Sequence, residues 1–169
     1  MKKFLVVFAL FCALVVMFGC NKNHQVSYKL QWSNKASDSM PWNDAINYCK
    51  NLNEGGHSDW RLPNIDELRT LIKNCPKTES SGECKVSEQG KCLSLKCWQP
   101  SSSCSCALKE DNSGYYSKLG DDDNVGLLSS SVVSDDSNRV WYIAFGYAGP
   151  TALYNKAISG QVRCVRNAE

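Results

Sequence analysis

The sequence predicts a small α+β domain that follows an N-terminal export signal, on the basis of three observations. Two helical patterns come early in the chain, several strand-like segments follow, and a cysteine-rich stretch separates them. Two early helices followed by a run of antiparallel strands is an α+β arrangement. About 149 residues remain after the signal, which is the size of one domain.

Residues 1–19 have the composition of a secretory signal peptide. Lys2 and Lys3 precede an uncharged apolar run from Phe4 to Phe18, and a small residue, Gly19, follows. The run of about 15 residues is shorter than the roughly 20 that a membrane-spanning helix needs. A cleaved signal is therefore favoured over a retained membrane anchor.

The end of this signal resembles a lipobox, the processing site of bacterial lipoproteins. Its residues are Met17-Phe18-Gly19-Cys20, with Met17 in place of the usual Leu. The resemblance implies lipidation of Cys20, a lipidated tether over residues 20–27, and a membrane as partner through several acyl chains. Asn21 rather than Asp follows, which indicates the outer membrane if the cell is Gram-negative. The alternative is a secreted protein cut nearby, with Cys20 incidental.

Charge argues against a nucleic-acid partner. Without the two lysines of the signal, 17 basic residues face 17 acidic residues, so the mature chain has no net charge. Binding to nucleic acid needs a clear basic excess. The oligomeric state is not set by the sequence.

The mature chain keeps eight cysteines besides Cys20, and an even number in an exported chain predicts a disulfide framework. Up to four bridges are possible, and 105 connectivities are open. Six of the eight fall between residues 75 and about 112, where large apolar residues are few, so this stretch is predicted to be a disulfide-stapled insertion. The eight are Cys49, Cys75, Cys84, Cys92, Cys97, Cys104, Cys106 and Cys164.

The segments before the insertion predict one strand and two helices. Residues 28–32 alternate as a strand does. Residues 41–52 carry an apolar stripe at helical spacing that includes Cys49, so this cysteine should face the core. Asn64 and Glu67 form a capping-box pattern at the start of a second helix, which should end at residues 74–76.

The segments after the insertion predict four strands. They span residues 125–133, 139–145, 151–156 and 161–166, with turns at 135–138 and 146–150. Residues 139–145 are apolar on both faces, which is typical of a strand buried on both sides.

Four ordered segments together resemble a known family, DUF1566, which includes the C-terminal (Lcl_C) domain of the Legionella collagen-like adhesin. The resemblance covers residues 28–74 and 113–166 and leaves the cysteine-rich insertion outside. The domain would thus occupy residues 28–169. The segments are Met40-Pro41-Trp42-Asn43-Asp44-Ala45-Ile46-Asn47-Tyr48-Cys49, Ser58-Asp59-Trp60-Arg61-Leu62-Pro63-Asn64-Ile65-Asp66-Glu67-Leu68, Val140-Trp141-Tyr142-Ile143-Ala144-Phe145 and Val162-Arg163-Cys164-Val165-Arg166.

The resemblance implies a C-type-lectin-like fold with paired terminal strands and a bridge between Cys49 and Cys164. It also implies an adhesin-like domain outside the cytoplasm that binds a glycan, either neutral or sulfated, although a net charge of zero argues against sulfate. The second hypothesis is a structural lipoprotein, or one that binds an envelope or host surface protein. The third is an oxidase, because residues 61–64 also resemble formylglycine-generating enzymes. Those enzymes use a late pair of cysteines, and only Cys164 lies late here.

The sequence predicts no catalytic site, no cofactor and no metal. His24 lies in the tether and His57 in a glycine-rich turn. Neither segment provides the rigid frame that a catalytic base needs. The cysteines lack the C-x2-C spacing of zinc sites. Calcium binding by residues 121–124, an acidic stretch, is less favoured than a solvated loop. Trp32, Trp42, Trp60 and Trp141 are expected in the core. Five aromatic residues are candidate ligand contacts: Trp98, Tyr115, Tyr116, Tyr147 and Tyr154.

Overall fold

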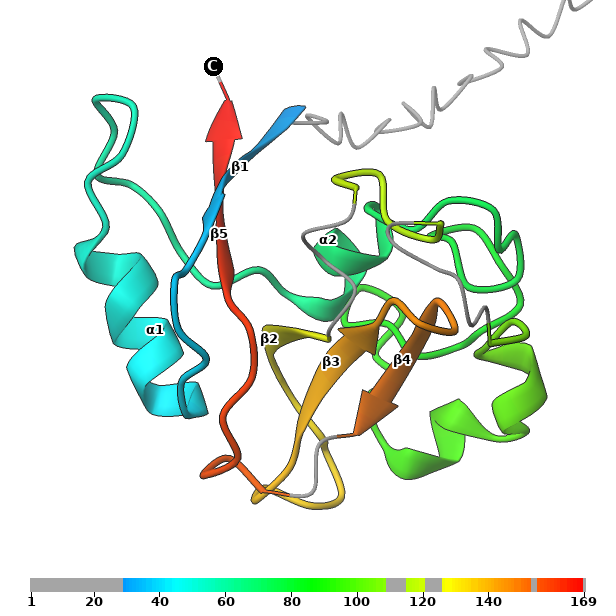
Figure 1. Ribbon diagram of the computed structural model, residues 1–169. Helices are drawn as coiled ribbons and strands as arrows, with labels where there is room; N and C mark the ends of the chain where they lie inside the picture. Colours follow the sequence, from blue (N-terminus) through cyan, green and yellow to red (C-terminus); the bar gives the residue numbers. More distant parts are fainter. Residues whose placement is uncertain (1–28, 109–114, 121–125, 153–154, 169) are drawn as a thin grey trace, which may run out of the picture.

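The structure, a computed structural model, describes residues 29–108, 115–120, 126–152 and 155–168. The signal, the tether with Cys20, and Tyr154 lie outside these ranges. The described chain is α+β, as predicted, with two small antiparallel sheets, two α-helices and four disulfides. In Figure 1 the pair of terminal strands runs between helix α1 on the left and the second sheet and insertion on the right.

The first sheet joins the two ends of the domain. Strand β1 (Lys29–Lys35) pairs antiparallel with strand β5 (Arg163–Ala168), which is the terminal pairing that the family resemblance implies. The register shifts between Trp32 and Lys35. At this irregularity the Ser33 hydroxyl accepts a hydrogen bond of 2.8 Å from the Cys164 amide, so a side chain replaces the missing backbone partner.

The second sheet has strand order β2-β3-β4, with bounds Leu127–Val132, Val140–Ala144 and Gly149–Ala152. Val140, Trp141 and Ile143 are fully buried, as expected for a strand covered on both faces. Strand β4 begins at Gly149, inside the stretch predicted as a turn, because Gly149 and Pro150 pair with Ala144 and Ile143.

Strand β2 contains three serines, and hydrogen bonds explain how they are tolerated. Buried Ser129 donates to the Trp141 carbonyl at 2.7 Å. Buried Ser131 donates to the Glu88 carboxylate at 2.7 Å and accepts from the Ile65 amide at 3.0 Å. Buried polar groups are stable when they are paired in this way.

Both predicted helices are present, and the second is shorter than predicted. Helix α1 (Trp42–Asn51) buries Ala45 and Cys49. Helix α2 (Ile65–Arg69) starts with the predicted capping box of Asn64 and Glu67 but ends at Arg69. It stops early because residues 71–73 pair with residues 116–118: the Lys73 amide donates to the Tyr116 carbonyl, and the Lys118 amide donates to the Leu71 carbonyl.

All eight cysteines of the described chain form disulfides, which leaves no thiolate to bind a metal. Cys49 in α1 is bonded to Cys164 in β5, the pairing that the resemblance implies. The other three bridges lie within the insertion, as expected for a disulfide-stapled segment. They are Cys75–Cys106, Cys84–Cys104 and Cys92–Cys97.

A buried arginine also organises the insertion. Arg69, at the end of α2, is 2% exposed. Its guanidinium donates to the carbonyls of Thr78, Val86 and Glu79 at 2.9, 2.7 and 2.7 Å. Burial lowers the pKa of Arg69 from its ordinary value. One side chain thus holds two separate turns of the insertion against the domain.

Candidate functional site

The aromatic candidates that the structure describes differ in burial. Tyr116 is 3% exposed, so it packs in the core, and its hydroxyl donates to the Ala107 carbonyl at 2.8 Å. Desolvation by burial raises its pKa. Trp98, in the short 3-10 helix η1 (Leu95–Trp98), packs partly buried against the core.

The remaining described aromatic candidates have mixed exposure. The Tyr147 side chain is half-buried, with its hydroxyl 2.6 Å from the Thr151 hydroxyl. Tyr115 is 44% exposed and makes an edge-to-face contact with Tyr116, the ring centroids being 4.9 Å apart. Of the five candidates, Tyr115 therefore presents the most aromatic surface that the structure describes. Among the tryptophans expected in the core, Trp60 and Trp141 are buried, whereas Trp32 and Trp42 are half-buried.

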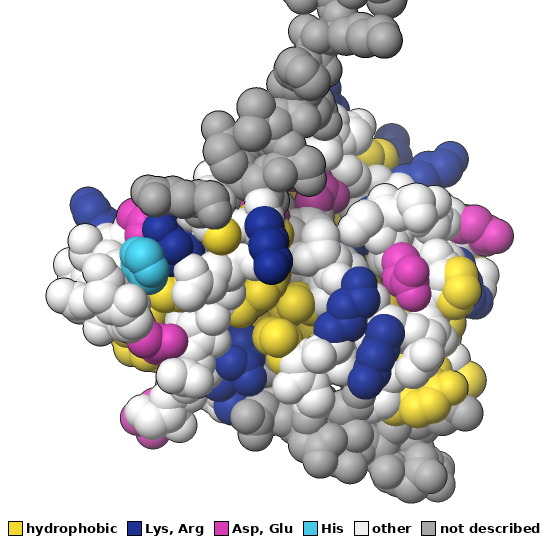
Figure 2. Space-filling model, turned by 90° about the horizontal axis from the view of Figure 1, so that it is seen from above, with side chains coloured by type: hydrophobic (Ala, Val, Ile, Leu, Met, Phe, Trp, Pro, Cys, Tyr) yellow, Lys and Arg dark blue, Asp and Glu magenta, His cyan; other side chains and the backbone are white. Residues whose placement is uncertain are grey.

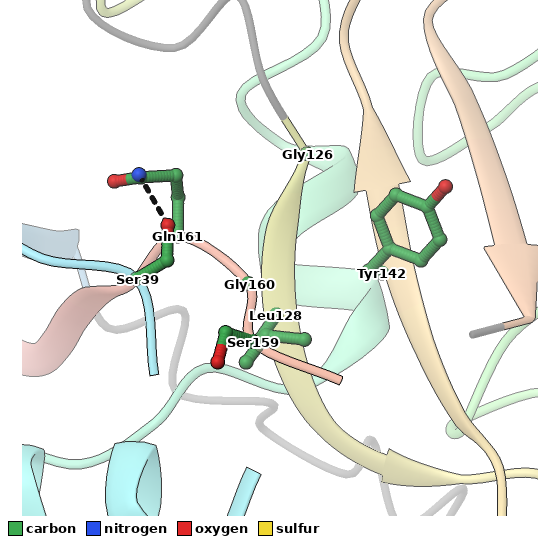
Figure 3. A pocket seen from close by; sticks show the side chains of 7 residues that line it. All are labelled: Ser39, Gly126, Leu128, Tyr142, Ser159, Gly160 and Gln161. Atoms are coloured by element: carbon green, nitrogen blue, oxygen red, sulfur yellow. Dashed lines mark hydrogen bonds between the residues drawn. The ribbon is translucent and has the colours of Figure 1, made fainter. Parts of the chain in front are cut away.

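An open groove of about 290 Å³ lies where four separate segments of the chain meet. Figure 3 shows its seven lining residues, with Tyr142 at one end and the pair Ser39 and Gln161 at the other. Leu128, in strand β2, lies between these two ends, and Tyr142 belongs to the neighbouring strand β3. The lining residues are Ser39, Gly126, Leu128, Tyr142, Ser159, Gly160 and Gln161.

Backbone hydrogen bonds fix the four segments relative to one another. The register of β2 and β3 places Leu128 opposite Tyr142. The Leu128 amide donates to the Gln161 carbonyl at 3.0 Å. Met40 and Gly160 exchange two backbone hydrogen bonds of 3.0 Å each. The segment 159–161 is therefore held between β2 and the residues that precede α1, and the groove has a rigid frame.

Two glycines let these segments approach closely. A Cβ atom on Gly126 would lie 2.3 Å from a ring carbon of Tyr142, and a Cβ atom on Gly160 would lie 2.7 Å from Leu128 Cγ. Both distances are far shorter than a normal contact between carbon atoms. Glycine at these positions allows the tyrosine ring and the leucine side chain to occupy their places in the groove wall.

The groove lining combines polar and apolar groups and carries no charge. None of its lining residues is an acid, a base or a cysteine. At one end Gln161 Nε2 donates to the Ser39 hydroxyl at 2.6 Å (Figure 3). Gln161 Oε1 is buried and has no hydrogen-bond partner in the described chain. Hydroxyls, one amide and an aromatic side chain suit a neutral, polar ligand, and they offer no nucleophile with an adjacent base.

Ion pairs occur outside the groove. Arg166 donates to the Asp59 carboxylate at 2.7 Å and to the Gln31 amide oxygen at 2.8 Å. The hydrogen bond from Arg166 lowers the pKa of Asp59. Arg61 binds both oxygens of Glu67, which raises the pKa of Arg61. Figure 2 shows basic and acidic side chains interspersed over the face seen from above.

The described residues contain no group of three or more His, Cys, Asp or Glu side chains arranged to hold a metal ion. His57 lies in the turn before Trp60, whose indole donates to the His57 carbonyl at 3.0 Å. His24 and the acidic stretch 121–124 lie outside the described ranges. No helix in the described part of the chain is both long and apolar enough to span a bilayer.

The fold defines a small α+β domain stabilised by disulfides, a class typical of exported proteins. The profile of the Lcl C-terminal domain family matches residues 24–166. The chain therefore belongs to this family, which confirms the resemblance stated above, and the matched range includes the cysteine-rich insertion. Searches of curated proteins and of solved structures returned no match.

Proposed function

We propose that this chain is a lipid-anchored, extracytoplasmic binding protein of the adhesin type, that its ligand is a glycan, and that it has no enzymatic activity. The observation that carries the proposal is the uncharged groove, in which a tyrosine lies opposite a serine–glutamine pair. Ligand sites combine apolar or aromatic walls with a few polar groups that set orientation. Membership of the Lcl C-terminal domain family supports an adhesin-like role.

The disulfides support the proposed location. Four bridges involve every cysteine of the described chain. Such frameworks persist in oxidising compartments and are rare in the cytosol. The lipid anchor is proposed from the lipobox-like sequence at Cys20. If a Cys20→Ala chain still fractionates with membranes, the lipidation proposal is wrong.

We also propose that the domain has a C-type-lectin-like fold. Three features support this proposal: two helices beside small antiparallel sheets, paired terminal strands, and a bridge from the first helix to the last strand. Fold alone does not determine function, so the proposed role depends on the groove.

The test is binding of the oxidised domain, from Asn21 onward, to a broad glycan panel with calcium and with chelator. Saturable binding to a defined glycan class is the expected result, and its response to chelator shows whether a metal takes part. Absence of binding by a fully bridged sample would refute the proposal and favour an envelope or host surface protein as partner. Turnover of a peptide cysteine to an aldehyde would instead support the oxidase alternative.

A further inference from the structure

We infer that the groove selects an uncharged sugar ring, so that the glycan bound there is neutral rather than sulfated. This inference rests on the proposed function, which it deepens by naming the ligand class and the residues that read it. Three observations carry it: the lack of charge in the groove, the position of Tyr142, and the hydrogen-bonding state of Gln161.

The absence of charge argues against a sulfate subsite within the groove. Proteins bind sulfate-like and phosphate-like anions through Arg, Lys or clustered backbone amides. The seven lining residues include neither Arg nor Lys. Lys156, in the loop before Ser159, lies over the Trp42 ring, 4.3 Å from its centroid. This lysine is therefore engaged with an aromatic face.

Tyr142 gives the groove an aromatic wall of fixed orientation. Its ring is half-buried and lies against Gly126, where a Cβ atom would approach to 2.3 Å. Because the backbone at Gly126 blocks one side, the ring cannot turn in that direction. A rigid aromatic ring offers apolar contact to a ligand at little cost in conformational entropy. The C–H face of a sugar ring is a surface of this apolar kind.

The opposite end of the groove can read hydroxyl groups. Ser39 accepts a hydrogen bond from Gln161 Nε2, so its own hydroxyl hydrogen is left to donate. Gln161 Oε1 is a buried acceptor without a partner in the described chain. A buried acceptor of this kind is stabilised when it gains a donor, which a ligand hydroxyl at this end of the groove would supply. Ser159 adds an exposed hydroxyl beside this pair.

The experiment uses two probe sets and one blocking variant. The oxidised domain is titrated with neutral oligosaccharides (trimers of glucose, galactose and N-acetylglucosamine) and with heparin. Each titration is repeated at about 0.1 M and about 1 M salt, where the Debye length falls from about 10 Å to about 3 Å. Ser159→Trp fills the groove from an exposed position. Ser81→Trp, an exposed serine in the insertion and outside the groove, is the matched control.

The expected result is binding of a neutral trimer that changes less than about twofold with salt, because no ion pair is involved. Ser159→Trp should weaken this binding by at least about tenfold, because the indole would occupy the space of the sugar ring. Ser81→Trp should leave it unchanged. Gln161→Leu, which removes the amide oxygen and the amide nitrogen at similar size, is the second variant and should also weaken binding.

Two outcomes would overturn the inference while the proposed glycan-binding function stands. One is binding of heparin alone with a steep salt dependence. The other is binding of a neutral trimer with an affinity that neither Ser159→Trp nor Gln161→Leu reduces. If the folded wild-type domain binds no glycan of either kind, the proposed function fails together with the inference.

Discussion

Removal of the Cys49–Cys164 bridge should destabilise the domain more than removal of any bridge inside the insertion. In the chain-entropy description, a disulfide stabilises a protein by an amount that rises with the loop it closes. Cys49 and Cys164 are 115 residues apart. The Cys75–Cys106 bridge, whose cysteines are 31 residues apart, shortens that path. The Cys49–Cys164 bridge therefore closes a loop of about 85 residues, which corresponds to a stabilisation of about 4.6 kcal/mol at 25 °C.

The Cys92–Cys97 bridge is the matched comparison. Its cysteines are 5 residues apart. The same relation between loop length and stability assigns this bridge a stabilisation of about 2.2 kcal/mol. Each double Cys→Ala variant loses two sulfur atoms, so the packing losses partly cancel in the comparison. The expected difference in the free energy of unfolding is therefore about 2 kcal/mol.

The assay is urea unfolding under non-reducing conditions, followed by tryptophan fluorescence. Trp60 and Trp141 are buried and will report the transition. The two variants must show similar urea dependence for their free energies to be compared. Equal losses in the two variants, or a larger loss for Cys92/Cys97, would refute the reasoning from loop length.

Three further predictions concern single side chains. Arg69→Met should cost about 3–5 kcal/mol in urea unfolding, because three carbonyls of the insertion lose a buried cationic donor; a loss below about 1 kcal/mol would show that water replaces the guanidinium. Asn64→Ala should cost about 1 kcal/mol through loss of the capping box, with Asn64→Asp as the control that keeps a cap. Asp59 has a lowered pKa in the folded state, so its pairing with Arg166 contributes stability above the unfolded pKa, and this is lost as pH falls through the folded value. Asp59→Asn should flatten the dependence of the melting temperature on pH below about 4, and an unchanged profile would show that this pair is not linked to folding.

Elements set by local sequence were predicted well. The start of α2 follows from Asn64 and Glu67, whose side chains cap a helix without help from the rest of the fold. The burial of β3 follows from its two apolar faces. The early end of α2 was missed because it depends on backbone pairing with residues 116–118, far along the chain.

The groove was not predicted, because no local pattern marks it. Its residues come from four separate segments, and all of them are uncharged. Gly126 and Gly160 were the available signal, since an isolated glycine at a strand often marks a close approach of another part of the chain. Arg69 was missed for a similar reason. A charged residue at a helix end is usually solvated, and only the folded insertion supplies the carbonyls that surround it.

The nesting of the disulfides constrains the order in which the chain can be oxidised. Cys49 precedes all six cysteines of the insertion, yet its partner Cys164 follows them all. In a chain delivered from its N-terminus to an oxidising compartment, Cys75 is the first thiol that Cys49 meets. Correct pairing therefore requires that Cys49 stay reduced until the last strand arrives, or that an early mispaired bridge be exchanged by another thiol. Efficient production of this domain should accordingly depend on disulfide isomerase activity rather than on oxidising strength alone.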